Sequence, residues 1–169
     1  MSAMQSLKDA GYDLLPLLSF NAATIDTRFG KAEDFRRHME AIAEKAALLT
    51  LTDVEPIGPK KLCDLLVVSP CTGNTLGKLA AGIYDTPVTL AVKSQLRANR
   101  PVLLGVSTND ALSGSAKSIA YLLNVRNIFF IPMAPDAPQE KPRSIVCRFE
   151  RTVEAAKAAL HGEQLPLLD

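Results

Sequence analysis

The chain is organised around Leu65-Leu66-Val67-Val68-Ser69-Pro70-Cys71-Thr72-Gly73-Asn74-Thr75-Leu76-Gly77-Lys78-Leu79-Ala80-Ala81. Its first part, 65–69, is apolar up to its final serine, which is typical of a strand with helices packed on both faces. Small and hydroxyl residues follow, and helix-forming residues continue after Thr75. This stretch predicts a buried parallel strand that ends in a tight turn and enters a helix.

The turn at Thr72–Thr75 is the best candidate for a ligand site. The first backbone N–H groups of a helix have no partner inside the helix, and the helix dipole adds partial positive charge there. Anions and polar ring edges bind at such helix starts. Thr72 and Thr75 are equally suited to cap the helix without any ligand, so both roles stay open.

The rest of the chain alternates in the same way. Strands are expected at 14–19, 48–52, 102–107 and 127–131, and helices at 31–47, 86–99 and 152–161. A further helix is expected through Leu123, capped by Asn109 or Ser113, and Thr86-Pro87 supplies an N-cap and a proline at the first helical position. The alternation predicts an α/β fold with a three-layer arrangement and a mostly parallel sheet.

We expect one domain over 1–169, with an extended proline-rich arm at 132–145 and a C-terminal helix at 146–162 that stops at Gly162. Residues 1–11 have the pattern of a helix that ends at Gly11. Domains of this type start with a strand, so we expect the usual first strand to be missing. The alternative is a domain that starts with a short helix.

Composition narrows the function classes. The formal net charge of the 169 residues is +1, which argues against a general nucleic-acid binder, and no apolar run approaches a membrane span. Three cysteines (Cys63, Cys71 and Cys147) lack disulfide-framework spacing, and His38 and His161 lack metal-ligand spacing. We expect a reduced cytoplasmic protein that holds no metal.

Seven stretches carry a resemblance to a known family. They are DTRFGKAEDF (26–35), PIGPKKL (56–62), PCTGNTLGKLAAGIYDTPV (70–88), LRANRPV (96–102), STNDAL (107–112), LLNVRNIFFIP (122–132) and KPRS (141–144). In this order and spacing the chain resembles the B subunits of dipicolinate synthase, from spore-forming bacteria. That family belongs to the flavoprotein superfamily, which also contains phosphopantothenoylcysteine decarboxylases and flavin prenyltransferases. The resemblance implies a Rossmann-like flavoprotein fold.

The resemblance also implies a function. The B subunit works with a separate A subunit to form dipicolinate from dihydrodipicolinate, or from its hydroxylated precursor, during sporulation in the mother cell. The A subunit resembles a nicotinamide-dependent oxidoreductase, so NAD(P) is expected on that subunit and not on this chain. FMN is the cofactor that the superfamily suggests for this chain, and a homo-oligomer is expected.

By similarity to the superfamily, the FMN contacts are short side chains and backbone groups at three strand ends. They are Ser19, Pro70, Cys71, Thr72, Gly73, Asn74, Thr75, Ser107, Thr108 and Asn109. Ligands of open α/β sheets bind outside the carboxyl ends of the strands, so topology and resemblance favour the same edge.

The dicarboxylate substrate suggests Arg28, Asn74 and Lys78 as its ligands. A lone loop arginine is more often a surface ion-pair partner, and Lys78 is equally suited to a solvated position. Cys71 is expected to be a buried core residue more than a nucleophile. No catalytic residue is identified.

The chain departs from the superfamily pattern at several positions, and these departures leave two alternatives to an enzyme subunit that binds FMN. The decarboxylases need a histidine upstream of Pro70, and 55–61 contains none. The Gly/Ser-rich loop after the first strand also has no counterpart, and the prenyltransferases have an arginine where this chain has Ser107. The chain is then a non-catalytic assembly partner with an empty flavin-like site or, more remotely, an FMN-dependent decarboxylase.

Overall fold

The structure is a computed structural model and describes residues 2–168. In that range the sheet has five strands, which are β1 (Leu66–Cys71), β2 (Val102–Thr108), β3 (Ile128–Phe130), β4 (Met133–Pro135) and β5 (Ile145–Cys147). β1 and β3 pair with β2 in parallel, while β5 pairs with both β2 and β4 antiparallel. The expected α/β class with a parallel centre is confirmed.

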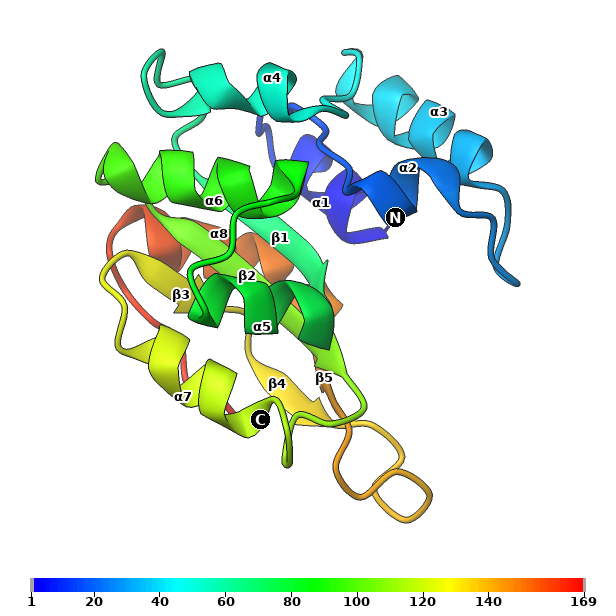
Figure 1. Cartoon of the computed structure of the whole chain (residues 1–169), viewed down its shortest axis with the longest axis vertical. Helices are drawn as coiled ribbons and strands as arrows, with labels where there is room; N and C mark the ends of the chain where they lie inside the picture. The colour runs from blue at the N-terminus through cyan, green and yellow to red at the C-terminus, as the bar shows by residue number, and fades with distance from the viewer. Residues whose placement is uncertain (1, 169) are drawn as a thin grey trace.

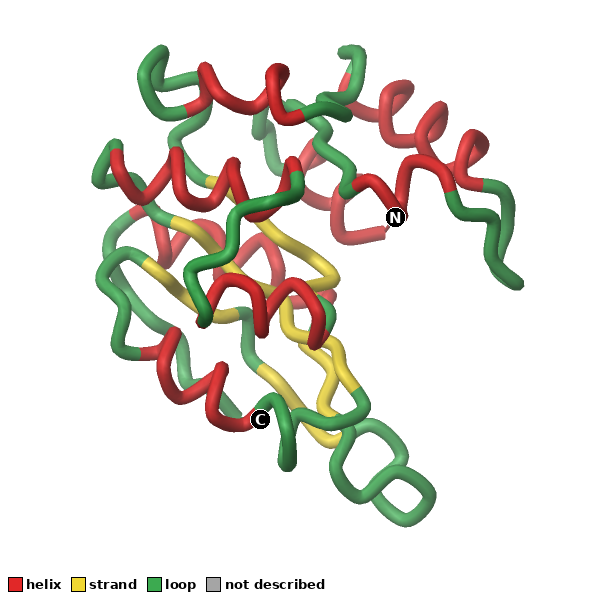
Figure 2. The backbone as a smooth tube through the Cα atoms, in the orientation of Figure 1, coloured by secondary structure: helices red, strands yellow, loops and turns green. Residues whose placement is uncertain are grey.

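Helices cover both faces of this sheet (Figure 1). On one face lie α5 (Gly73–Ala80), α6 (Pro87–Arg97) and α7 (Ala116–Leu123). On the other lie α1 (Ser2–Asp9) and α8 (Thr152–Leu160), which contact each other, and α8 also contacts β2. Figure 2 shows the strands enclosed between these two helical layers. The three-layer arrangement is therefore present.

A further group of helices lies at one end of the molecule (Figure 1). It consists of α2 (Phe20–Thr24), α3 (Ala32–Ala43), α4 (Leu51–Val54) and the 3-10 turn η1 (Glu55–Ile57). A second 3-10 turn, η2 (Phe149–Arg151), leads into α8. In the described residues no helix is long and apolar enough to cross a membrane.

β2 is the centre of the core. Val102, Leu103, Leu104 and Val106 are fully buried, because β2 has neighbours on both edges and helices on both faces. Gly105 allows the closest approach in the sheet: a Cβ there would lie 2.6 Å from the Ser69 Oγ and 3.0 Å from the Cys147 Sγ. A side chain at position 105 would therefore displace the side chains of Ser69 on β1 and Cys147 on β5.

The expected strands at 14–19 and 48–52 are wrong. The two segments share one parallel bridge, Leu17–Leu48, with hydrogen bonds from Leu18 N to Leu48 O and from Leu48 N to Pro16 O. Beyond it each segment enters a helix, because Ser19 and Thr50 are N-caps whose side chains accept backbone N–H groups. Local capping is satisfied within the segment, and it competes successfully with strand pairing.

Two predicted helix boundaries differ from the structure, one at the end of α3 and one at the start of α7. The helix expected over 31–47 covers only Ala32–Ala43, because Glu44 adopts a left-handed conformation with φ +57°. The N-terminal helix does end before Gly11, whose φ is +88°. Thr86 and Pro87 start α6 as predicted, and Thr86 and Thr89 cap it reciprocally. The cap expected at Asn109 or Ser113 is wrong, since α7 begins after Ser115.

The expected arm at 132–145 and the helix at 146–162 also need correction. Residues 133–135 and 145–147 pair as β4 and β5, and only the intervening turn is irregular. The C-terminal helix is limited to Thr152–Leu160. The prolines misled the prediction, because Pro132 precedes a three-residue strand and Pro135 ends it, positions where a missing N–H costs little.

Candidate functional site

The carboxyl ends of β1 and β2 meet at one edge of the sheet and are in direct contact. β1 ends at Cys71, which pairs in register with Val106, and Thr72 leads into α5. A Cβ built on Gly73 would lie 2.7 Å from the Oγ1 of Thr108, at the end of β2. The structure thus brings the predicted 70–75 turn and the 107–109 segment together.

Uncommitted donors gather at the start of α5. Thr72 occupies the N-cap position with extended backbone (φ −76°, ψ 162°), but within residues 2–168 its hydroxyl makes no capping bond. The same range supplies no hydrogen-bond partner for the side chains of Asn74 and Thr75. Thr72 and Asn74 are exposed and Thr75 is half-buried. The backbone N–H groups of the first turn and these short side chains can therefore donate to one acceptor-rich ligand.

Asp110 is the charged group beside this helix start. Its Oδ1 accepts hydrogen bonds from Thr108 Oγ1 (2.7 Å) and Ser115 Oγ (2.8 Å), and it would lie 3.3 Å from a Cβ on Gly73. The two hydroxyls, Thr108 foremost, hold the pKa of Asp110 below its ordinary value. A carboxylate at this place complements the positive end of the α5 dipole.

Ser115 was not predicted as part of the site. It is buried, and its Oγ would lie 3.2 Å from a Cβ on Gly73, in addition to its bond with Asp110. The hydroxyl-rich run at 107–115 is the sequence signal that points to such a network, because Ser and Thr in turns bond to neighbouring carboxylates. A side chain at position 73 would have to displace the Thr108 hydroxyl and so disturb its bond with Asp110.

Asn109 connects the site to the β4–β5 turn. Its Oδ1 accepts from Ser144 Oγ at 3.2 Å, and the same hydroxyl lies 3.3 Å from the Oδ2 of Asp136. Asp136 in turn pairs with Lys141 at 3.1 Å. Asn109 therefore lies at the expected strand end, and its side-chain oxygen is already used within the chain.

Three other predicted residues lie near the strand ends in different environments. Ser107 is half-buried on β2, opposite Val146 of β5. Pro70 is exposed at the end of β1. Cys71 is fully buried, and burial raises the pKa of its thiol to about 12, with a smaller contribution from nearby Cys147. The expectation of a buried core cysteine is confirmed, and the thiolate needed for a nucleophile is strongly disfavoured.

The remaining predicted residues have partners of their own. Ser19 caps α2, with its Oγ accepting from Ala22 N at 3.2 Å. Lys78 pairs with Asp85 at 2.8 Å, which holds the pKa of Asp85 below its ordinary value. Arg28 lies on an exposed turn between α2 and α3, with its guanidinium carbon 4.7 Å from the centroid of the Phe29 ring. The turn projects from the body of the molecule (Figure 1). Only Asn74 of the three expected substrate ligands lies at the start of α5 with an uncommitted side chain among the described residues.

Comparison with known proteins extends these observations. The Flavoprotein family model matches residues 3–158. The dipicolinate synthase B subunit of Bacillus subtilis is 38% identical over 168 residues, covering 98% of this chain and 83% of that protein. The crystal structure of the dipicolinate synthase B subunit from Bacillus halodurans superposes with a TM-score of 0.90 at 37% identity, covering 99% of this chain and 87% of that one.

A more distant solved structure shares the fold alone. The FMN-dependent cysteine decarboxylase TvaF from thioviridamide biosynthesis is 22% identical with a TM-score of 0.61, over 92% of this chain and 88% of that one. The Rossmann-like flavoprotein fold expected from the sequence is therefore confirmed. By its match to the family model and its similarity along nearly its whole length to these two relatives, the chain belongs to the Flavoprotein family and, within it, to the dipicolinate synthase B subunits.

Proposed function

We propose that the chain works with a separate A subunit to form dipicolinate from dihydrodipicolinate, or from its hydroxylated precursor, in the cytoplasm of a sporulating mother cell. The observation that carries this proposal is the 38% identity to the Bacillus subtilis protein over 98% of the chain. Oxidation of the dihydro compound removes two hydrogens, as a hydride to a nicotinamide on the A subunit and a proton to solvent. The contribution of this chain is then to bind and orient the substrate.

The start of α5 suits a cyclic dicarboxylate. Its first-turn N–H groups and the side chains of Thr72, Asn74 and Thr75 donate hydrogen bonds, and the helix dipole favours negative charge there. The Asp110 carboxylate limits how much added negative charge this edge accepts, so one carboxylate of the substrate is expected to bind here. Arg28 would bind the substrate only if the turn between α2 and α3 moved toward the start of α5. Lys78 would bind it only if its ion pair with Asp85 opened.

FMN is a second ligand that fits the same donors. Thr72, Asn74 and Thr75 would hold polar edges of FMN, with Ser107 on the adjacent strand. When bound, FMN would supply electron-pair transfer. Ser19, Thr108 and Asn109 would have to share their present hydrogen bonds to take part.

Those existing hydrogen bonds favour a second candidate function. If Ser19, Thr108 and Asn109 keep these hydrogen bonds, the flavin-like site is empty and the chain is a non-catalytic partner that stabilises the A subunit. A decarboxylase acting alone is the more remote alternative, because His38 and His161 are exposed on α3 and after α8, away from the start of α5.

The test is the rate of dipicolinate formation by purified A subunit with and without this chain. We expect the chain to raise the rate, and the variant pair Asn74→Ala and Thr75→Ala to lower that stimulation by about tenfold, as for loss of a hydrogen bond to a charged group. Thr52→Ala, on exposed α4, is the matched control. Equal rates with and without the chain reject the proposal.

Two further outcomes separate the candidates. Full stimulation by the Asn74→Ala, Thr75→Ala protein supports the assembly role, because the donors at α5 are then unnecessary. A flavin absorbance spectrum in the purified protein, lost in the same variant, supports FMN binding and contradicts an empty site.

A further inference from the structure

A shallow apolar groove lies on the face of the molecule formed by α5, α6 and α7. Its volume is about 60 Å³, and its walls are Leu79, Tyr84, Val92, Leu96, Tyr121, Leu122, Val125 and Ile128. Tyr121 is 58% exposed beside it although its ring is large and mostly apolar. A volume of that size holds roughly two water molecules, so it accepts the end of one apolar side chain and excludes a nucleotide.

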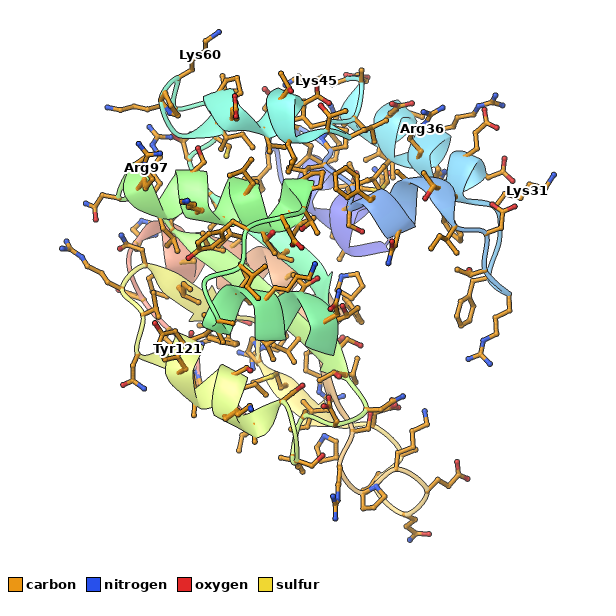
Figure 3. The ribbon with its side chains drawn as sticks, in the orientation of Figure 1. Lys31, Arg36, Lys45, Lys60, Arg97 and Tyr121 are labelled. Atoms are coloured by element: carbon orange, nitrogen blue, oxygen red, sulfur yellow. The ribbon has the colours of Figure 1, made fainter. Side chains whose placement is uncertain are left out.

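Four cations lie on the helices that form the groove or directly after them, and the Nζ of one, Lys93, is 4.9 Å from the centroid of the Tyr84 ring in the groove wall. Lys93 and Arg97 lie one turn apart on α6, Lys117 lies one turn before Tyr121 on α7, and Arg126 follows Val125. All four are exposed, and the described part of the chain offers no carboxylate in an ion pair with any of them. Figure 3 shows Arg97 and Tyr121 on the same side of the molecule, at α6 and α7.

The sequence around the groove has a pronounced charge imbalance. Residues 86–135 contain five basic residues and one acidic residue, Asp110. Arg100 is already paired with Asp64 at 2.8 Å, and Asp110 is held by Thr108 and Ser115 at the other end of β2. The whole chain is nearly neutral at +1, so the segment that contributes α6 and α7 is more basic than the rest, and Asp85, which follows the lining residue Tyr84, is already paired with Lys78.

We infer that this basic groove is the docking surface for an acidic surface of the A subunit that inserts one apolar side chain beside Tyr121. The inference rests on the proposed function, because that function requires an A subunit. Exposed cations around an apolar centre match the usual interface pattern of a polar rim and an aromatic anchor. Charge complementarity is what specifies an acidic partner.

The other occupants are less suited. A second copy docked by a two-fold axis through this face would bring this basic surface against the same basic surface of its partner, and like charges repel. Nucleic acid would use the cations and could stack a base on the exposed Tyr121 ring, but the groove is too small to admit a base and most of its lining is aliphatic. The apolar lining and the charged rim together favour a protein partner.

The experiment measures binding of purified A subunit to the intact chain by biolayer interferometry at several salt concentrations. We expect the double reversal Arg97→Glu, Lys117→Glu to weaken binding at least tenfold, mainly through a slower association rate, and to reduce the salt dependence. Tyr121→Ala should weaken it by a similar factor through faster dissociation while leaving the salt dependence unchanged. If the variants only disturbed the fold, the charge reversal would not act mainly on the association rate and Tyr121→Ala mainly on the dissociation rate.

The matched control is Lys60→Glu, Lys157→Glu, which reverses the same number of charges on the loop after η1 and on α8 and should bind as the parent does. Thermal unfolding confirms that each variant is folded. Parent-like affinity of both groove variants overturns the inference and leaves the proposed function intact. Absence of A-subunit binding by the parent chain overturns both. Binding of a single-stranded oligonucleotide that the Glu variant abolishes, with A-subunit affinity unchanged, also overturns it.

Discussion

At the scale of single residues, the three cysteines differ in how deeply they are buried. Cys71 and Cys147 are in the core, and burial raises their pKa values to about 12 and about 11. Cys63 is only half-buried, although burial raises its pKa as well. Reagents attack the thiolate, so exposure and pKa together determine reactivity.

We expect a thiol-specific reagent at pH 8 to modify Cys63 slowly and to leave Cys71 and Cys147 intact in the folded protein. In denaturant all three should react, which provides the control for total thiol. The measurement is reagent stoichiometry with peptide mapping. Rapid modification of Cys71 in the native state would show that its thiol is accessible and would reopen a nucleophilic role.

At the scale of elements, the β2–α7 turn and the start of α5 act as one unit through Asp110. The carboxylate has a pKa below its ordinary value because Thr108 and Ser115 donate to it. A group whose pKa is depressed by folding stabilises the folded state above its unfolded pKa. That stabilisation is lost as the pH falls through the lower, folded pKa.

The free energy of unfolding should therefore decrease on acidification below about pH 4, and Asp110→Asn should flatten part of that decrease. Urea denaturation at a series of pH values measures it. Because Asp110 is exposed, the effect will be modest. Glu163→Gln, at an exposed position after α8, is the control, and an identical pH profile for Asp110→Asn and the parent contradicts the assignment.

At the scale of the whole molecule, the C-terminal residues complete the edge of the sheet. The side-chain Oε1 of Gln164 accepts a hydrogen bond from the Phe130 N–H at 2.7 Å, and its Nε2 donates to the Phe130 carbonyl at 2.9 Å. The amide thus pairs with Phe130 as a neighbouring strand would. Leu167 O accepts from Met133 N at 2.8 Å. The tail thereby satisfies backbone groups of β3 and β4 that would otherwise lie at an open edge.

Gln164→Ala should lower the free energy of unfolding by about 1–3 kcal/mol, because two backbone groups lose their partner. Gln139→Ala, on the exposed β4–β5 turn, removes the same side chain where no such bond is made in the described chain, and should change little. Chemical denaturation compares the two. Equal stability of both variants would mean that water replaces the Gln164 amide without cost.

The sequence by itself determined the features that depend on local chemistry. The apolar run before Ser69, the Thr86-Pro87 start of α6 and the buried Cys71 follow from burial and capping rules, and the family follows from matched motifs in fixed order. The contact of Gly73 with Thr108 and Ser115, the short pairing of β4 with β5 and the Lys78–Asp85 pair came only from tertiary structure. Local preferences act within a few residues, whereas Gly73 meets Thr108 and Ser115, and β4 meets β5, only where the packed sheet brings them together, and the Lys78–Asp85 pair depends on the path of the loop after α5. For the 70–75 turn, the sequence placed the helix start, and the fold decided which side chains around it remain free to bind.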